Sequence, residues 1–172
     1  VILLQEFDYD SLGSKPNSSK AAELLQKNYL SRAHHGHKAI TYPYVYTAPV
    51  NTGVQSGVDL DHSGVAGDSG NDAFGFGNHP GVYGMLVLSK YPIDTRSVRT
   101  FQKFLWKDLP GVVWPKCATT VVPPEDDPYG DNTSCNTPLG QDFYSPKAKK
   151  VLRLASKSHW AVPITVGDEK IH

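Results

Sequence analysis

The chain has 172 residues, 39% of them hydrophobic and 20% charged, and its 17 basic and 17 acidic side chains give a formal net charge of zero. This composition predicts one domain with a substantial core and excludes a disordered or fibrous chain, and no apolar run is long enough to span a membrane. Without an excess of positive charge, a phosphate-bearing ligand must be held by local groups or by a metal ion.

The first element is a continuous apolar run over residues 1–4 that ends in Gln5 and Glu6. Such a run predicts a strand buried on both faces, with Glu6 at its mouth. A carboxylate there is costly to desolvate unless a cation, a hydrogen-bond donor or water meets it. Glu6 is therefore either a ligand of a binding site or a side chain that reaches solvent where the strand ends.

A helix is predicted next, over residues 20–30, with Ser18 or Ser19 as its N-cap. We expect three of its side chains to bury one face: Leu24, Leu25 and Tyr29. Histidines 34, 35 and 37 follow the helix, where cations complement its C-terminal dipole, so we interpret them as capping residues and not as a zinc site.

Residues 40–46 alternate large and small side chains and predict a strand, which Pro43 restricts to an edge or a strand start. The following 32 residues, 50–81, form a Gly- and Asp-rich inserted loop. Residues 85–89 predict a second buried strand.

The inserted loop contains Asp59, Asp61 and Ser63 followed by Gly64, a spacing that can wrap oxygen ligands around Ca²⁺. The twelfth position, where a calcium loop carries a bidentate Glu, is occupied by glycine. An ordinary loop built on Asx turns is the alternative.

Residues 110–143 form a polar excursion that contains both cysteines, Cys117 and Cys135. A disulfide between them would stabilise the loop by roughly 3 kcal/mol and would imply an oxidising compartment, so that the protein is secreted or periplasmic. Two free thiols are the alternative.

A short helix is predicted over residues 147–154 after Ser145 and Pro146, and residues 156–164 lead into a final strand. Lys157 and His159 flank the start of that strand and could contact phosphate. Alternation would also allow one of them to face solvent while the other packs beside Trp160.

Three segments in this order and spacing resemble the endonuclease/exonuclease/phosphatase superfamily: residues 4–6, 81–93 and 154–160. Residues 71–77 resemble a Gly-Asp-Ala-x-Gly-Phe-Gly stretch of bacterial members. The resemblance implies a deoxyribonuclease-like four-layered α/β sandwich and a metal-dependent phosphoester hydrolase. Glu6 matches the ligand of Mg²⁺ or Mn²⁺, and Asn78, His79 and His159 are candidate substrate-binding residues.

The resemblance covers only part of such a domain. The superfamily's first strand should precede Val1, and its catalytic His, Gly-Asp-x-Asn strand and Asp-His pair should follow His172. We therefore expect residues 1–172 to be a single partial domain, inactive as this chain alone, whose substrate is a phosphoester of undetermined type. The alternatives are a non-catalytic, calcium-stabilised binding module and a half domain completed by a second chain.

Overall fold

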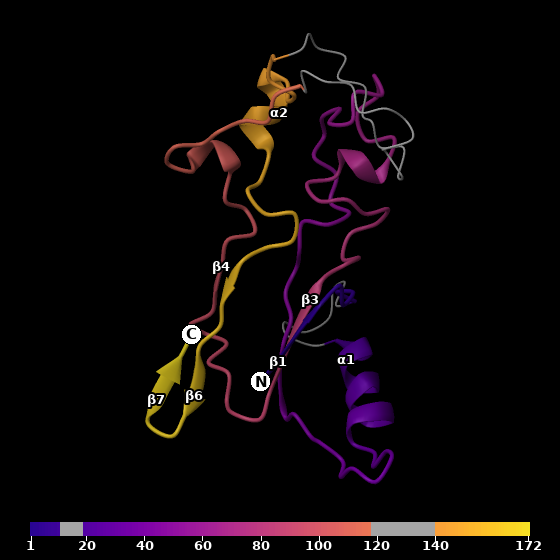
Figure 1. Ribbon diagram of the computed structural model, residues 1–172, viewed down its shortest axis with the longest axis vertical. Coiled ribbons are helices and arrows are strands. Elements are labelled where there is room, and N and C mark those ends of the chain that lie inside the picture. Colours follow the sequence, from indigo (N-terminus) through magenta and orange to yellow (C-terminus); the bar gives the residue numbers. More distant parts are fainter. Residues whose placement is uncertain (11–18, 118–139) are drawn as a thin grey trace.

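A computed structural model describes residues 1–10, 19–117 and 140–172 (Figure 1). Small antiparallel sheets and short helices make up this part of the chain, consistent with an α/β fold. The elements in chain order are β1 Ile2–Gln5, α1 Lys20–Leu25, η1 Gln26–Leu30, β2 Tyr44–Tyr46, η2 Gly70–Asp72, β3 Met85–Ser89, β4 Arg99–Thr100, η3 Trp106–Asp108, α2 Pro146–Val151, β5 Trp160–Ala161, β6 Ile164–Val166 and β7 Glu169–Ile171.

The largest sheet has the strand order β1-β3-β2, with antiparallel pairing on both sides of β3. Its register pairs Ile2 with Leu88 and Gln5 with Met85. The two apolar runs of the sequence, residues 1–4 and 85–89, therefore pair with each other in one sheet. β3 is buried from Leu86 to Ser89, as its continuous apolar sequence predicts, and β2 lies at a sheet edge, as Pro43 requires.

β1 is not buried on both faces, and that prediction is wrong. Ile2 and Leu4 pack with Ala22 of α1 against the core side chains of β3, whereas Leu3 is 67% exposed. Since α1 covers only one face of the sheet, the side chains that alternate to the other face stay open. The apolar composition of β1 cannot reveal which of its faces is covered.

The first helix begins at the predicted cap, because the Ser19 hydroxyl accepts a hydrogen bond from Ala22 N at 3.1 Å. α1 continues directly into the π-helical turn η1. Tyr29 is 64% exposed and Leu24 is 43% exposed, so two of the three side chains expected to be buried are not. Leu25 packs on the core as expected, and Leu30 at the end of the π turn packs there with it.

A second core lies at the opposite end of the molecule, around α2 (Figure 1). Val58 and Leu60 of the inserted loop pack there against Ala148 and Leu152. The Ser145 hydroxyl caps α2 by accepting a hydrogen bond from Ala148 N at 3.1 Å, and the helix ends at Val151, three residues earlier than predicted. In Figure 1 the β6-β7 hairpin lies at the opposite end of the molecule from α2, and β4 lies between the two.

The inserted loop, residues 50–81, contains one short helix, η2, and buries polar as well as apolar side chains. Asn51 is 0% exposed and its amide donates to the carbonyl oxygens of Gln102 (2.8 Å) and Ala155 (2.7 Å). Its side-chain oxygen accepts a hydrogen bond from Arg153, whose guanidinium lies 4.1 Å from the Phe74 ring centroid. Hydrogen bonds therefore attach the loop to the segment that leads into β5.

Cys117 is buried and disulfide-bonded. Its predicted partner, Cys135, lies outside the described residues, so the pairing stays a prediction. No helix in the described part of the chain is both long and apolar enough to cross a lipid bilayer.

Candidate functional site

Glu6 follows β1 at an irregularity in the sheet. Its φ of 57° is in the left-handed region, which side-chain-bearing residues rarely adopt. The β1-β3 pairing nevertheless resumes after it, because Phe7 N donates to Gly84 O at 3.1 Å and Tyr9 N donates to Gly81 O at 2.7 Å. Such a break changes the direction of a side chain relative to the alternating sides of the strand. Bulges near binding sites often have this effect.

Two glycines allow the chain to approach so closely here. A Cβ at Gly84 would lie 2.7 Å from Phe7 O, and one at Gly81, whose φ is +97°, would lie 2.4 Å from Tyr9 O. Only glycine fits such contacts without moving the backbone. These residues therefore position the segment that carries Glu6.

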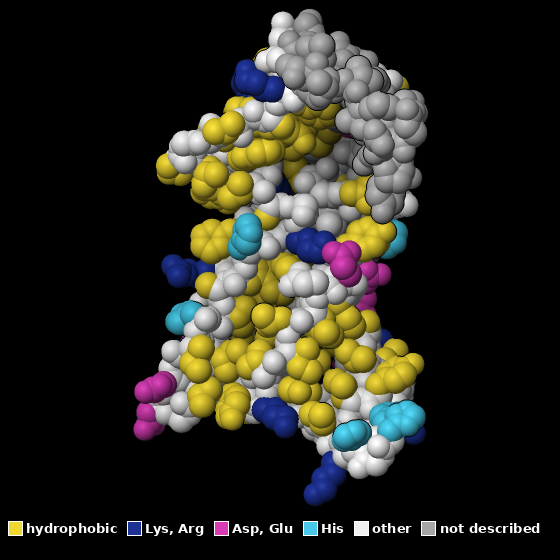
Figure 2. All heavy atoms as spheres, in the orientation of Figure 1, with side chains coloured by type: hydrophobic (Ala, Val, Ile, Leu, Met, Phe, Trp, Pro, Cys, Tyr) yellow, Lys and Arg dark blue, Asp and Glu magenta, His cyan; other side chains and the backbone are white. Residues whose placement is uncertain are grey.

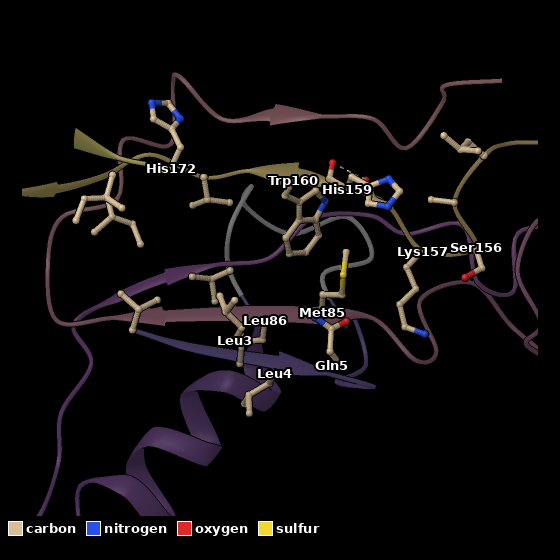
Figure 3. A pocket seen from close by; sticks show the side chains of 18 residues that line it. Leu3, Leu4, Gln5, Met85, Leu86, Ser156, Lys157, His159, Trp160 and His172 are labelled. Atoms are coloured by element: carbon tan, nitrogen blue, oxygen red, sulfur yellow. Dashed lines mark hydrogen bonds between the residues drawn. The ribbon is translucent and has the colours of Figure 1, made fainter. Parts of the chain in front are cut away.

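The Glu6 carboxylate forms an ion pair with Lys157. Its Oε1 lies 2.6 Å from Lys157 Nζ, with 59% of the Glu6 side chain and 20% of the Lys157 side chain exposed. Figure 3 shows Lys157 extending from the segment before β5 toward the β1-β3 sheet. The pair thus joins two segments that are far apart in the sequence.

The inserted loop fixes the backbone of Lys157. Asn51 N donates to Lys157 O at 2.9 Å, and a Cβ at Gly75 would lie 2.3 Å from Ser156 O. The lysine stem is largely buried along this path, which leaves the ammonium as the part that reaches the site. Lys157 is therefore an anchored residue with a movable charged end.

The chemistry of Glu6 suits a hard cation such as Mg²⁺ or Mn²⁺, which prefers oxygen ligands. The carboxylate is more than half exposed, so water can supply further ligands. Among the described residues, only Lys157 is paired with it. Glu6 can supply one metal ligand, and other oxygens must complete the coordination shell.

The predicted substrate-binding residues lie on exposed segments. Asn78 and His79 are exposed, and their segment packs on the inserted loop: a Cβ at Gly53 would lie 1.8 Å from His79 O, and one at Gly70 would lie 2.9 Å from Asn78 Oδ1. His159 is also exposed, and its carbonyl oxygen accepts a hydrogen bond from Phe101 N at 2.9 Å. Contact of these residues with a site at Glu6 stays a prediction.

A second group of oxygen ligands lies in the inserted loop. Asp59, Asp61 and Asp72 each offer a carboxylate oxygen within 4.8 Å of the others. The spacing that predicted a calcium loop thus brings Asp59 and Asp61 together, and the structure adds Asp72. Ser63, the third predicted ligand, donates its hydroxyl to Asp68 Oδ2 at 3.0 Å.

The three carboxylates differ in their environments. Asp72 is 0% exposed and accepts backbone hydrogen bonds from Leu60 N at 2.5 Å and Gly67 N at 2.6 Å. A hydrogen bond from Ser63 N, assisted by the Ser69 hydroxyl, lowers the pKa of Asp61. Asp59 Oδ2 accepts from Gly64 N at 2.9 Å, whereas its buried Oδ1 has no hydrogen-bond partner. A buried carboxylate oxygen without a partner is costly unless a cation meets it.

A cavity of about 890 Å³ lies between the open face of the β1-β3-β2 sheet and the strands β5 and β6. Leu3 and Met85 line it on one side and Trp160 and Ile164 on the other, with Lys157 also in its wall. In Figure 3, Trp160 points from β5 toward Met85. Figure 2 shows hydrophobic side chains gathered over this open part of the surface.

Sequence reasoning did not find two residues of these clusters. Lys157 was considered for phosphate contact but not as the partner of Glu6, because nothing in the local sequence indicates a contact between such distant positions. The Asp-x-Asp-x-Ser-Gly spacing does not include Asp72, which lies 11 residues after Asp61 and joins the group only in the folded chain. Its position next to the turn-forming Ser69 and Gly70 is the one local signal for it.

Comparison with known proteins gives one match. A family model described as "Endonuclease/Exonuclease/phosphatase family" matches residues 1–143. The searches of curated proteins and of solved structures returned no match.

Proposed function

Because the chain belongs to the endonuclease/exonuclease/phosphatase family, whose members are metal-dependent phosphoester hydrolases, we propose that Glu6 is a ligand of its catalytic Mg²⁺ or Mn²⁺. Such a cation polarises the scissile phosphate and stabilises the charge that develops on its oxygens. The observation that carries the proposal is the position of Glu6: a half-exposed carboxylate at the mouth of β1, at a break in the sheet and beside a lysine.

The other parts of the site are assigned by position. Asn78, His79 and His159 are exposed polar residues that we assign to the phosphoester substrate. Neutral or cationic donors of this kind stabilise non-bridging phosphate oxygens. The substrate class within phosphoesters, whether DNA, RNA, lipid or inositol phosphate, depends on loops around the site.

Metal binding tests the assignment of Glu6. The free-ion electron paramagnetic resonance signal of Mn²⁺ measures binding, and all proteins carry Asp59→Asn so that the acidic group of Asp59, Asp61 and Asp72 contributes little. We expect Mn²⁺ to bind the protein with Glu6 more tightly than Glu6→Gln, which keeps the shape and removes the charge. Glu169→Gln in the exposed strand β7 is the matched control. Equal Mn²⁺ binding with and without the Glu6→Gln substitution would reject Glu6 as a ligand.

We further propose that residues 1–172 are part of a four-layered α/β sandwich and are inactive alone. One carboxylate cannot saturate a hard cation, and hydrolysis also requires groups that activate water and hold the phosphate. The exposed apolar residues Val1 (58%), Leu3 (67%) and Ile171 (57%) beside the cavity support completion by further polypeptide, which a second chain could supply. Analytical ultracentrifugation tests for self-association: a monomer at all concentrations would argue against a second copy of this chain.

The group of Asp59, Asp61 and Asp72 in the inserted loop supports a second candidate function, a calcium-stabilised binding module. The buried, unpartnered Asp59 Oδ1 within the Asp59-Asp61-Asp72 group favours it. We expect Ca²⁺ to raise the melting temperature of the wild-type protein and not that of Asp59→Asn, because a ligand that binds only the folded state stabilises it. An equal rise in both proteins would place Ca²⁺ elsewhere.

The disulfide supports a proposal on location. Disulfides persist in oxidising compartments, and Cys117 is disulfide-bonded, so we propose that the protein is secreted or periplasmic. Fractionation of cells that produce the protein, with a cytoplasmic marker as control, tests this assignment. Recovery of the protein with the cytoplasmic marker would reject it.

A further inference from the structure

We propose that Lys157 is the phosphate-binding cation of the Glu6 site, and that its ammonium transfers from the Glu6 carboxylate to a substrate phosphate oxygen when the metal ion binds. The proposal rests on the proposed function of Glu6 as a metal ligand. It adds the residue that would link metal binding to substrate binding at that site.

The first step of the argument is the ion pair. With Lys157 Nζ 2.6 Å from Glu6 Oε1, the ammonium lies where a cation bound to the same oxygen would lie. A metal ion on this oxygen and the ammonium beside it would repel each other, and solvent would screen the repulsion only partly because the Lys157 side chain is largely buried. A metal ion on Glu6 therefore requires the ammonium to leave this position.

The second step is the freedom of the lysine to make that change. The backbone of Lys157 is fixed by the hydrogen bond from Asn51 N, and its stem is mostly buried, so the residue itself stays in place. The ammonium is a compact charge on a flexible stem and can reorient by side-chain rotation alone. Movement of the charged end does not require the fold to change.

The third step is the identity of the new partner. A displaced ammonium at the edge of the apolar cavity needs an anion as a new partner. Within the described residues, Lys157 forms an ion pair with Glu6 and with no other carboxylate. A phosphate bound together with the metal ion would supply the required negative charge near Glu6 and within the surroundings of Lys157. A lysine serves this purpose as a point charge, without the bidentate geometry of arginine.

The experiment measures Mn²⁺ binding with and without inorganic phosphate, and every protein compared carries Asp59→Asn to weaken the acidic group in the inserted loop. Removing the competing ammonium in Lys157→Met should tighten Mn²⁺ binding by about fivefold in the absence of phosphate, which corresponds to the upper end of the strength of a partly exposed ion pair. With Lys157 present, phosphate should strengthen Mn²⁺ binding by about fivefold or more, because two coupled ligands raise each other's affinity by the same factor. Phosphate should have no such effect in Lys157→Met. Lys103→Met, which removes an exposed lysine elsewhere, should behave as the Asp59→Asn protein does.

Two further variants separate the possible outcomes. Lys157→Arg keeps the positive charge, so phosphate should still strengthen Mn²⁺ binding in this variant. If phosphate had no effect in Lys157→Arg, the packing of the lysine stem would matter and not its charge, and the proposal would be overturned. If Glu6→Gln loses Mn²⁺ binding while Lys157→Met matches the Asp59→Asn protein, the role of Lys157 is wrong and that of Glu6 stands. If Glu6→Gln binds Mn²⁺ like the Asp59→Asn protein, both assignments fail. Circular dichroism of each variant confirms that the fold is kept.

Discussion

The rings of Tyr46 and Trp160 meet edge to face, with their centroids 5.0 Å apart and their planes at 86°. Tyr46 ends β2 and Trp160 begins β5, so this contact joins the β1-β3-β2 sheet to the β4-β5 sheet across one side of the cavity. Aromatic pairs in this geometry contribute about 0.5–1.5 kcal/mol beyond the area that they bury. The contact therefore helps to hold Lys157, three residues before Trp160, opposite Glu6.

Substitution of Trp160 tests this contact. Trp160→Ala should lower the free energy of unfolding by about 3 kcal/mol, because it removes a large aromatic side chain from between two sheets. Trp160→Phe should be tolerated much better, since it keeps a ring against Tyr46 and removes an indole Nε1 that is buried without a hydrogen-bond partner. Urea unfolding followed by circular dichroism measures both. Equal losses in the two variants would contradict the role given to the ring contact.

Asn51 provides a second stability test. Asn51→Ala removes hydrogen bonds to the carbonyl oxygens of Gln102 and Ala155 and leaves Arg153 without its acceptor, so we expect a loss of about 2–4 kcal/mol in the free energy of unfolding. The exposed Asn28 supplies the control, and Asn28→Ala should change stability by less than about 0.5 kcal/mol. A small effect of Asn51→Ala would show that the loop is held to the β5 segment by other contacts.

Much of the fold could be predicted because local sequence determines it. β3 was found from its continuous apolar run, and the caps at Ser19 and Ser145 from residue type and position. The exposure of Leu3 could not be found in this way, because it depends on which face of the sheet α1 covers. The same holds for Lys157, whose contact with Glu6 is created by tertiary packing through Asn51.

The acid dependence of stability should include a contribution from Asp94. Hydrogen bonds from Lys170 Nζ at 2.7 Å and from the Ser97 hydroxyl at 2.9 Å lower the pKa of Asp94 from 3.8 to about 2. Because the folded-state pKa lies below the unfolded value, the stabilisation is complete above about pH 4 and is lost as the pH falls toward 2. Carboxyl-carbon NMR titration should show the pKa of Asp94 rising toward its ordinary value in Lys170→Met. An unchanged titration would mean that the Lys170 contact is not formed in solution.

The disulfide at Cys117 predicts a redox-dependent stability. If Cys117 pairs with Cys135, mass spectrometry without reductant should give a mass about two daltons below that of the reduced chain. Reduction should then lower the free energy of unfolding by roughly 3 kcal/mol, because it removes a constraint on the unfolded chain. Cys135→Ser should reproduce that loss without reductant. Two thiols that titrate in the folded, unreduced protein would contradict the pairing.

The last prediction concerns catalysis. Residues 1–172 alone should show no Mg²⁺- or Mn²⁺-dependent phosphodiesterase activity above background, since one carboxylate cannot hold a hard cation, activate water and stabilise the phosphate. A longer polypeptide that also contains the family's remaining catalytic strands should hydrolyse a generic phosphodiester such as bis-p-nitrophenyl phosphate. In that polypeptide, Glu6→Gln should lower kcat by about a hundredfold or more, and Glu169→Gln should not. Metal-dependent turnover by residues 1–172 that survives Glu6→Gln would show that catalysis does not depend on this carboxylate.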